Sequence, residues 1–105
     1  MSRFVKVAAA AQIAPGSALK VRIEDREIAV FNLDGEFLAT ADQCTHMNAS
    51  LSEGRVTSAH VICPWHGARF EVRTGRCLGA KPHPSLQTYN VRLEGDDVEV
   101  ELPDP

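Results

Sequence analysis

Cys44-Thr45-His46 and Cys63-Pro64-Trp65-His66 stand sixteen residues apart in this chain. Each segment supplies one cysteine thiolate and one histidine imidazole, and both side chains are common ligands of transition metals. Two mixed pairs on two separate loops are typical of a metal site. The sequence therefore predicts one centre with four protein ligands, which are Cys44, His46, Cys63 and His66.

The pattern C-x-H, sixteen residues, C-x-x-H resembles the binding signature of Rieske [2Fe–2S] proteins. That resemblance implies one [2Fe–2S] cluster, with Cys44 and Cys63 on one iron and His46 and His66 on the other. Two thiolates neutralise the oxidised core, whereas four thiolates leave it dianionic. An electron is therefore added more easily to the mixed site, which raises its reduction potential.

Structural zinc is the alternative for the same four residues, because zinc also accepts two thiolates and two imidazoles. Zinc fingers usually group their cysteines together and their histidines together. Here each pair mixes the two residue types, which favours the cluster over a zinc-stapled interaction module.

Length and composition limit the class of protein. A chain of 105 residues is expected to form one domain, spanning 1–105. The net charge of −3 argues against nucleic acid as a partner. Three cysteines are too few for a disulfide scaffold, and no apolar run has the length of a signal core or a membrane span. We therefore expect a cytoplasmic protein without a membrane anchor.

Alternating apolar and polar residues predict an all-β fold. Four expected strands, at 4–8, 19–23, 28–33 and 36–40, are joined as an antiparallel meander. Two more, at 86–93 and 98–102, form a final hairpin across Gly95-Asp96. Short strands and turns are expected between them, over 51–54, 55–57, 60–62, 70–72 and 76–78. The predicted architecture is an antiparallel β sandwich or barrel with a small cluster-binding subdomain inserted at about 42–84.

The resemblance extends from about Asp42 to Gly79. The run from Cys63 to Phe70, followed by Arg73-Thr74-Gly75, is similar to the ferredoxins of bacterial aromatic-ring-hydroxylating dioxygenases. This implies a soluble one-electron carrier rather than an enzyme. Its expected partners are an NAD(P)H-dependent flavin reductase, which reduces it, and a terminal Rieske non-heme iron dioxygenase, which it reduces. The alternative is the Rieske small subunit of another redox enzyme, such as NAD(P)H nitrite reductase.

An independent oxygenase is disfavoured by the histidine count. Such an enzyme holds a mononuclear iron with two histidines and a carboxylate. Once the motif has taken its two histidines, only His60 and His83 remain, and the chain offers no second domain to house the site.

Four positions differ from the respiratory, high-potential branch of the resembled family. Ala49 and Trp65 stand where that branch has disulfide-forming cysteines, and Ala68 and Phe70 stand where it has a serine and a tyrosine that donate hydrogen bonds to the cluster. Neither Ala68 nor Phe70 has a side-chain donor. Since such donors stabilise the reduced cluster, we expect a potential near the lower end of the Rieske range, about −150 mV.

The remaining candidate residues have simpler interpretations. Cys77 lies in a strand-like context and is expected to pack as a small hydrophobic residue. His60 is expected in a turn or at the surface. His83, between two prolines in a loop (Lys81 to Ser85) that the resemblance places over the cluster, either contacts the cluster's surroundings or is a plain loop residue.

Charge is unevenly distributed along the chain. After Arg92 the chain has acidic residues but no basic ones, whereas basic residues outnumber acidic ones between Asp42 and Lys81. This pattern indicates either solvated surfaces or electrostatic steering of redox partners to the cluster end.

Overall fold

The structure is a computed structural model that describes residues 2–43, 49–57, 59–64, 68–78 and 84–103. Within these ranges the regular structure consists of β-strands and two short 3-10 helices, η1 (Ala10–Gln12) and η2 (Leu51–Glu53). The strands pair antiparallel in three sheets. The predicted all-β class is confirmed.

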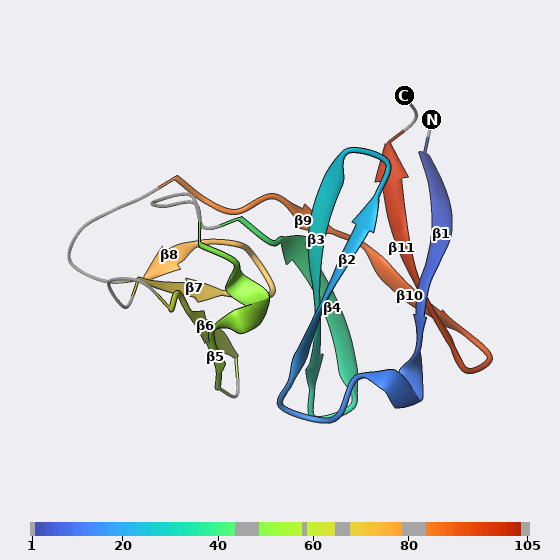
Figure 1. Cartoon of the computed structure of the whole chain (residues 1–105), viewed down its shortest axis with the longest axis horizontal. Helices are drawn as coiled ribbons and strands as arrows, with labels where there is room; N and C mark the ends of the chain where they lie inside the picture. The colour runs from blue at the N-terminus through green and yellow to red at the C-terminus, as the bar shows by residue number, and fades with distance from the viewer. Residues whose placement is uncertain (1, 44–48, 58, 65–67, 79–83, 104–105) are drawn as a thin grey trace.

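Two of the sheets form a sandwich, at the right of Figure 1. The first has the order β1-β11-β10 and the second has the order β2-β3-β4-β9. Their strands are β1 (Ser2–Ala9), β11 (Asp97–Pro103), β10 (Val91–Glu94), β2 (Ala18–Ile23), β3 (Arg26–Leu33), β4 (Glu36–Ala41) and β9 (Thr88–Tyr89).

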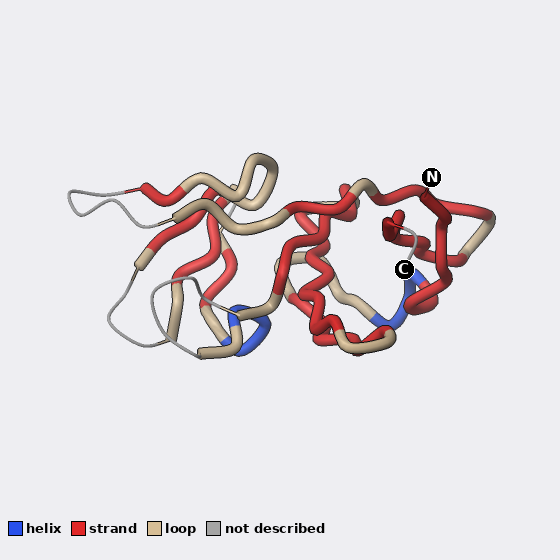
Figure 2. Tube along the Cα trace, turned by 90° about the horizontal axis from the view of Figure 1, so that it is seen from above, coloured by secondary structure: helices blue, strands red, loops and turns tan. Residues whose placement is uncertain are grey.

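The third sheet is smaller and lies at the other end of the elongated molecule, which measures 40 × 31 × 18 Å (Figures 1 and 2). Its order is β5-β6-β7-β8. These strands, β5 (Arg55–Val56), β6 (His60–Ile62), β7 (Arg69–Glu71) and β8 (Cys77–Leu78), belong to the region predicted as the cluster-binding subdomain.

Strand β3 connects the two ends of the molecule because both of its faces are buried. Ile28 and Val30 belong to the core between the two large sheets, together with Val98 and Val100. Ala29 and Phe31 point to the opposite face and belong to a second core, which contains residues of the small sheet. The alternation of side chains along one strand therefore fixes the small sheet against the sandwich.

Tight turns set the register of the second large sheet. Asp34 and Gly35 both have positive φ, at 55° and 96°, and they join β3 to β4 with Leu33 opposite Glu36. Such φ values belong to a two-residue hairpin turn whose twist matches the strands it joins. The hairpin that the sequence predicts at Asp34-Gly35 is confirmed.

Two of the predicted elements differ in the structure. β1 does not belong to the meander but pairs with β11, because alternation identifies a strand without identifying its neighbour. The single strand expected over 86–93 is divided: β9 pairs with β4, and β10 then pairs with β11 in the other sheet. Within 51–54, where short strands and turns are expected, the structure has the 3-10 helix η2.

One exposed ion pair joins the two ends of the molecule. Arg73, in the turn after β7, donates to both carboxylate oxygens of Glu36 at 2.7 and 2.5 Å. The hydrogen bond from Arg73 holds the pKa of Glu36 below its ordinary value. A lowered folded-state pKa stabilises the fold above the unfolded pKa, and this stabilisation is lost as pH falls through the folded pKa.

We therefore expect Arg73→Gln to raise the pKa of Glu36 toward its ordinary value. An NMR titration of the Glu36 side chain measures this directly, and Arg76→Gln is a control in the same turn region. A Glu36 titration that is unchanged in Arg73→Gln would show that the pair does not persist in solution. Because both side chains are exposed, we expect little change in thermal stability.

No helix in the described part of the chain is long and apolar enough to cross a membrane.

Candidate metal centre

The loop expected to carry Cys44 and His46 is tied together at its base. Gln43 and Ser50 form an isolated antiparallel bridge, and the Leu51 backbone N–H donates to the Asp42 carbonyl at 2.7 Å. Ala49, the first described residue after the ligand segment, is buried. The two ends of this loop are therefore held side by side.

The second ligand loop begins at Cys63, which directly follows β6. Ile62 pairs with Arg69 across β6 and β7, and the Cys63 backbone N–H donates to the Ala68 carbonyl at 2.7 Å. Cys63 is only 2% exposed. A hairpin thus brings both ends of segment 63–68 together and holds the cysteine in the interior.

Both loop bases belong to one hydrophobic core. Ala49 and Cys63 are members of the same cluster of buried residues, along with Leu51, Val61 and Phe70. The described ends of the two loops are therefore joined through one core, which also contains Ala29 and Phe31 of β3. This placement is the one that a four-ligand site shared by the two loops requires.

Of the four predicted ligands, Cys63 lies in the described part of the structure. Cys44, His46 and His66 lie outside the described residues, as do Trp65 and His83. The assignment of these side chains to the centre stays a prediction. Within the described ranges, no three His, Cys, Asp or Glu side chains gather as a potential metal site.

The donor set suits a [2Fe–2S] cluster in these surroundings. Cys63, the predicted ligand in the described part of the chain, is enclosed by apolar side chains, and an apolar shell penalises a highly charged group. Two thiolates and two imidazoles give an uncharged oxidised centre, whereas four thiolates give a dianion. The interior around Cys63 therefore fits the mixed ligand set.

The neighbouring side chains match several interpretations made from the sequence. Phe70 is fully buried and Ala68 is half-buried at the second loop, and neither side chain has a hydrogen-bond donor. Cys77 is half-buried and packs against the same core as Cys63, which confirms a packing role. His60 is half-buried at the start of β6, and its carbonyl accepts the Thr57 backbone N–H at 2.8 Å.

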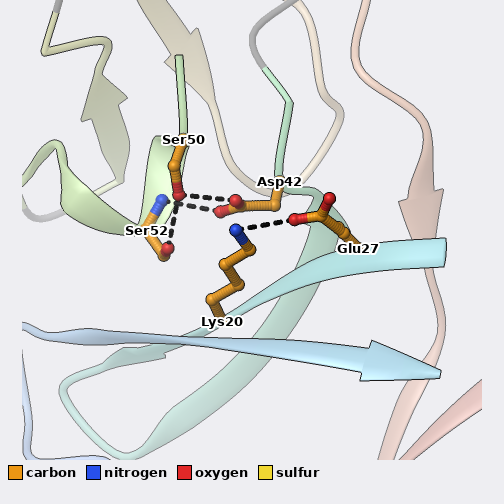
Figure 3. Close-up of polar contacts among 5 residues, drawn as sticks. All are labelled: Lys20, Glu27, Asp42, Ser50 and Ser52. Carbon is orange, nitrogen blue, oxygen red and sulfur yellow. Dashed lines mark hydrogen bonds and ion pairs between the residues drawn. The ribbon is translucent and has the colours of Figure 1, made fainter. Parts of the chain in front are cut away.

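The structure adds one residue that the motif did not reveal. Asp42 is 2% exposed, and its carboxylate receives hydrogen bonds from Ser50 and Ser52 on the far side of the first loop (Figure 3). In the sequence it was only an acidic residue two positions before Cys44. Its burial depends on contacts with residues eight and ten positions later, which no local pattern shows.

Comparison with known proteins agrees with this geometry. The family model of the Rieske [2Fe-2S] domain matches residues 3–90. The biphenyl dioxygenase ferredoxin subunit of Pseudomonas sp. (strain KKS102) is 43% identical over 100 residues, which covers 94% of this chain and 92% of the relative. Such relatives are named as ferredoxin components of dioxygenase systems, which confirms the expectation of an electron carrier rather than an oxygenase.

Solved structures show the same fold. A chain in the complex of reduced oxygenase and oxidized ferredoxin in carbazole 1,9a-dioxygenase is 36% identical, with a TM-score of 0.86 and coverage of 92% of this chain and 91% of that one. The putative NADH-dependent nitrite reductase small subunit from Mycobacterium tuberculosis has a TM-score of 0.89 at 23% identity, covering 100% of this chain and 99% of that one. The second likeness shows the fold alone.

Together, the closed ligand loops, the buried Cys63 and the family match over most of the sequence show that this chain belongs to the Rieske [2Fe–2S] family and binds a Rieske-type cluster.

Proposed function

We propose that this protein is the ferredoxin of an aromatic-ring-hydroxylating dioxygenase system. It accepts one electron from an NAD(P)H-dependent flavin reductase and passes it to a terminal Rieske non-heme iron dioxygenase. The observation that carries this proposal is the 43% identity to a dioxygenase ferredoxin subunit along nearly the full length of both chains. The nitrite reductase alternative is supported only by a shared fold.

In this proposal, Cys44 and Cys63 bind one iron, and His46 and His66 bind the other. The bound cluster supplies reversible one-electron transfer. The chain's own residues hold the ends of the ligand loops together and bury Cys63 among apolar side chains. Beside the second loop, the side chains of Ala68 and Phe70 cannot donate hydrogen bonds to the cluster. Because such donors would stabilise the reduced cluster, their absence should keep its reduction potential near the lower end of the Rieske range. A low potential also suits a carrier that is reduced by a flavin reductase.

The reductase as a partner and the cytoplasm as the compartment are also part of this proposal. A reducing compartment keeps cysteine thiols available as cluster ligands, and NAD(P)H-fed reductases operate there. Ala49 and Trp65 stand at the two positions where the respiratory branch has disulfide-forming cysteines, so this chain cannot form that disulfide.

Exposed arginines at the small-sheet end provide a surface for acidic partners. Arg55, Arg69 and Arg76 are exposed on or beside the strands that flank the second ligand loop. At the sandwich end, in contrast, the acidic strand β11 includes Glu99 and Asp97, which pair with Arg92 and Lys6. The exposed arginines therefore favour docking of the small-sheet end on a partner surface of negative potential.

A charge reversal at Arg69 tests both the partner class and the docking end. We expect Arg69→Glu to lower the second-order rate of electron transfer to the terminal oxygenase of a biphenyl dioxygenase system, about threefold to tenfold at low salt. The rate is measured by stopped-flow absorbance after chemical reduction of the ferredoxin, over a series of ionic strengths.

Arg22→Glu is the matched control, because Arg22 is an exposed arginine on β2 of the sandwich. It changes the net charge by the same amount at a different place. Equal slowing by both variants would refute docking at the small-sheet end. No electron transfer from the wild-type protein to any dioxygenase tested would contradict the proposed function itself.

A further inference from the structure

The carboxylate of Asp42 joins the two sides of the first ligand loop. Asp42 follows β4, and its Oδ2 accepts a hydrogen bond from Ser50 Oγ at 2.5 Å. Its Oδ1 accepts the Ser52 backbone N–H at 2.8 Å. Figure 3 shows both bonds, with Ser52 Oγ also 2.9 Å from Ser50 Oγ. Both carboxylate oxygens of Asp42 therefore accept hydrogen bonds from residues on the far side of the loop.

The backbone of Asp42 strengthens the same closure. Its carbonyl accepts the Leu51 backbone N–H at 2.7 Å, and its own N–H donates to the Glu27 carbonyl at 3.0 Å. One residue thus ties the start of the loop to its end and ties both to strand β3. Asp42 precedes Cys44 by two residues, a distance that extended chain spans in at most about 7 Å.

The charge around Asp42 is only partly compensated. Lys20 Nζ lies 2.6 Å from a Glu27 carboxylate oxygen, beside Asp42 in Figure 3. The pKa of Lys20 is raised, first by its hydrogen bond to Glu27 and its attraction to Glu27, and then to a smaller extent by Asp42 and Glu53. Two cations, Lys20 and Arg26, line the cleft beside Asp42, and Lys20 interacts with three carboxylates: Glu27, Asp42 and Glu53.

The hydrogen bonds alone do not require a carboxylate. An asparagine at position 42 could accept the Ser52 N–H with its carbonyl oxygen and donate to Ser50 Oγ with its amide nitrogen. Burial of an anion without a directly bonded cation is unfavourable, and Asp42 is 2% exposed with no cation among its hydrogen-bond donors in Figure 3. The carboxylate therefore adds something that loop closure does not need, namely a negative charge near the cluster ligands.

We propose that Asp42 is a positioning residue that closes the loop bearing Cys44 and His46, and that its buried negative charge lowers the reduction potential of the cluster. A negative charge opposes the addition of an electron, and burial reduces its screening by solvent. This inference rests on the ligand assignment in the proposed function.

Asp42→Asn separates the charge from the loop closure. In this variant we expect full iron content and a reduction potential higher than in the wild type, measured by protein-film voltammetry at low ionic strength. Asp42→Ala removes the hydrogen bonds as well, and we expect it to lose iron to a chelator several times faster than the wild type. Asp96→Asn, in the exposed turn before β11, removes one negative charge far from the cluster end and should leave both values unchanged.

Lys20→Gln tests the charge without altering Asp42. Lys20 is exposed, so the variant is expected to fold, and removal of the cation should lower the potential. An unchanged or lower potential in loaded Asp42→Asn would overturn the electrostatic role, as would an unchanged or higher potential in Lys20→Gln. Iron retention by Asp42→Ala equal to that of the wild type would overturn the closing role. A wild-type protein that binds no cluster would instead refute the ligand assignment, so the two failures are distinguishable.

Discussion

Replacement of Cys63 by alanine is expected to abolish cluster binding, with iron falling from about two atoms per chain to near zero. Cys63 is buried between the small sheet and β3, so no solvent-exposed group can take over its role without rearrangement. Loss of this thiolate leaves one iron with an incomplete ligand set. Iron analysis and visible absorbance measure the result directly.

The same substitution should loosen one end of the molecule more than the other. Metal binding contributes to folding where the site is absent from the unfolded chain. The core between the large sheets, which includes Val98, Val100 and Leu102, contains no ligand residue and should persist. We expect faster hydrogen exchange in β5, β6, β7 and β8 of Cys63→Ala, and nearly unchanged exchange in β1 and β11.

Cys77→Ala is the matched control for this experiment. Cys77 packs against the same core and lies on β8, opposite Phe70 on β7. Its loss removes a sulfur atom from the same region but no predicted ligand. Cluster retention in Cys63→Ala, or cluster loss in Cys77→Ala, would show that the ligand assignment at this position is wrong.

Gly75→Ala should destabilise the protein by about 2–5 kcal/mol, a large share of the stability of a small domain. Gly75 has φ +78°, and a Cβ there would lie 2.2 Å from the Leu86 carbonyl oxygen. The Leu86 backbone N–H also donates to the Gly75 carbonyl at 2.7 Å. The turn between β7 and β8 is thus packed directly against the segment that leads back into the sandwich.

Gly16→Ala isolates the backbone contribution to this effect. Gly16 has φ +80°, but a Cβ there would meet nothing within 4 Å. We expect that variant to lose only about 1–2 kcal/mol, the cost of a left-handed conformation for a residue with a side chain. Both free energies of unfolding are measured by denaturant titration. Equal losses in the two variants would show that the contact with Leu86 relaxes without cost.

The sequence was informative wherever the decisive residues are neighbours. Cys63 and His66 are three residues apart, and Asp34 and Gly35 are adjacent, so local spacing was enough to predict a ligand pair and a hairpin. Alternation also located most of the strands. Where a strand pairs is decided by distant residues, and β1 therefore appeared to belong to the wrong sheet.

The transfer of the chain between sheets was equally hidden. Thr88 pairs with Thr40 in one sheet, and Val91 pairs with Val100 in the other, but the sequence continues to alternate through both. Asn90 marks the change of sheet, where its carbonyl accepts the Glu101 backbone N–H at 2.8 Å. The closing role of Asp42 was hidden for the same reason, because it depends on Ser50 and Ser52 rather than on adjacent residues.

We propose that two histidines, His46 and His66, and two cysteines, Cys44 and Cys63, hold the [2Fe–2S] cluster. Pulsed electron paramagnetic resonance of the dithionite-reduced protein, prepared with 15N-labelled histidine, tests it most directly. We predict a paramagnetic reduced state with strong hyperfine couplings to two histidine nitrogens. In His66→Ala, we predict that one of these couplings disappears or that the whole cluster is lost. A reduced cluster without nitrogen couplings, or a colourless and silent sample containing stoichiometric zinc, would contradict the account.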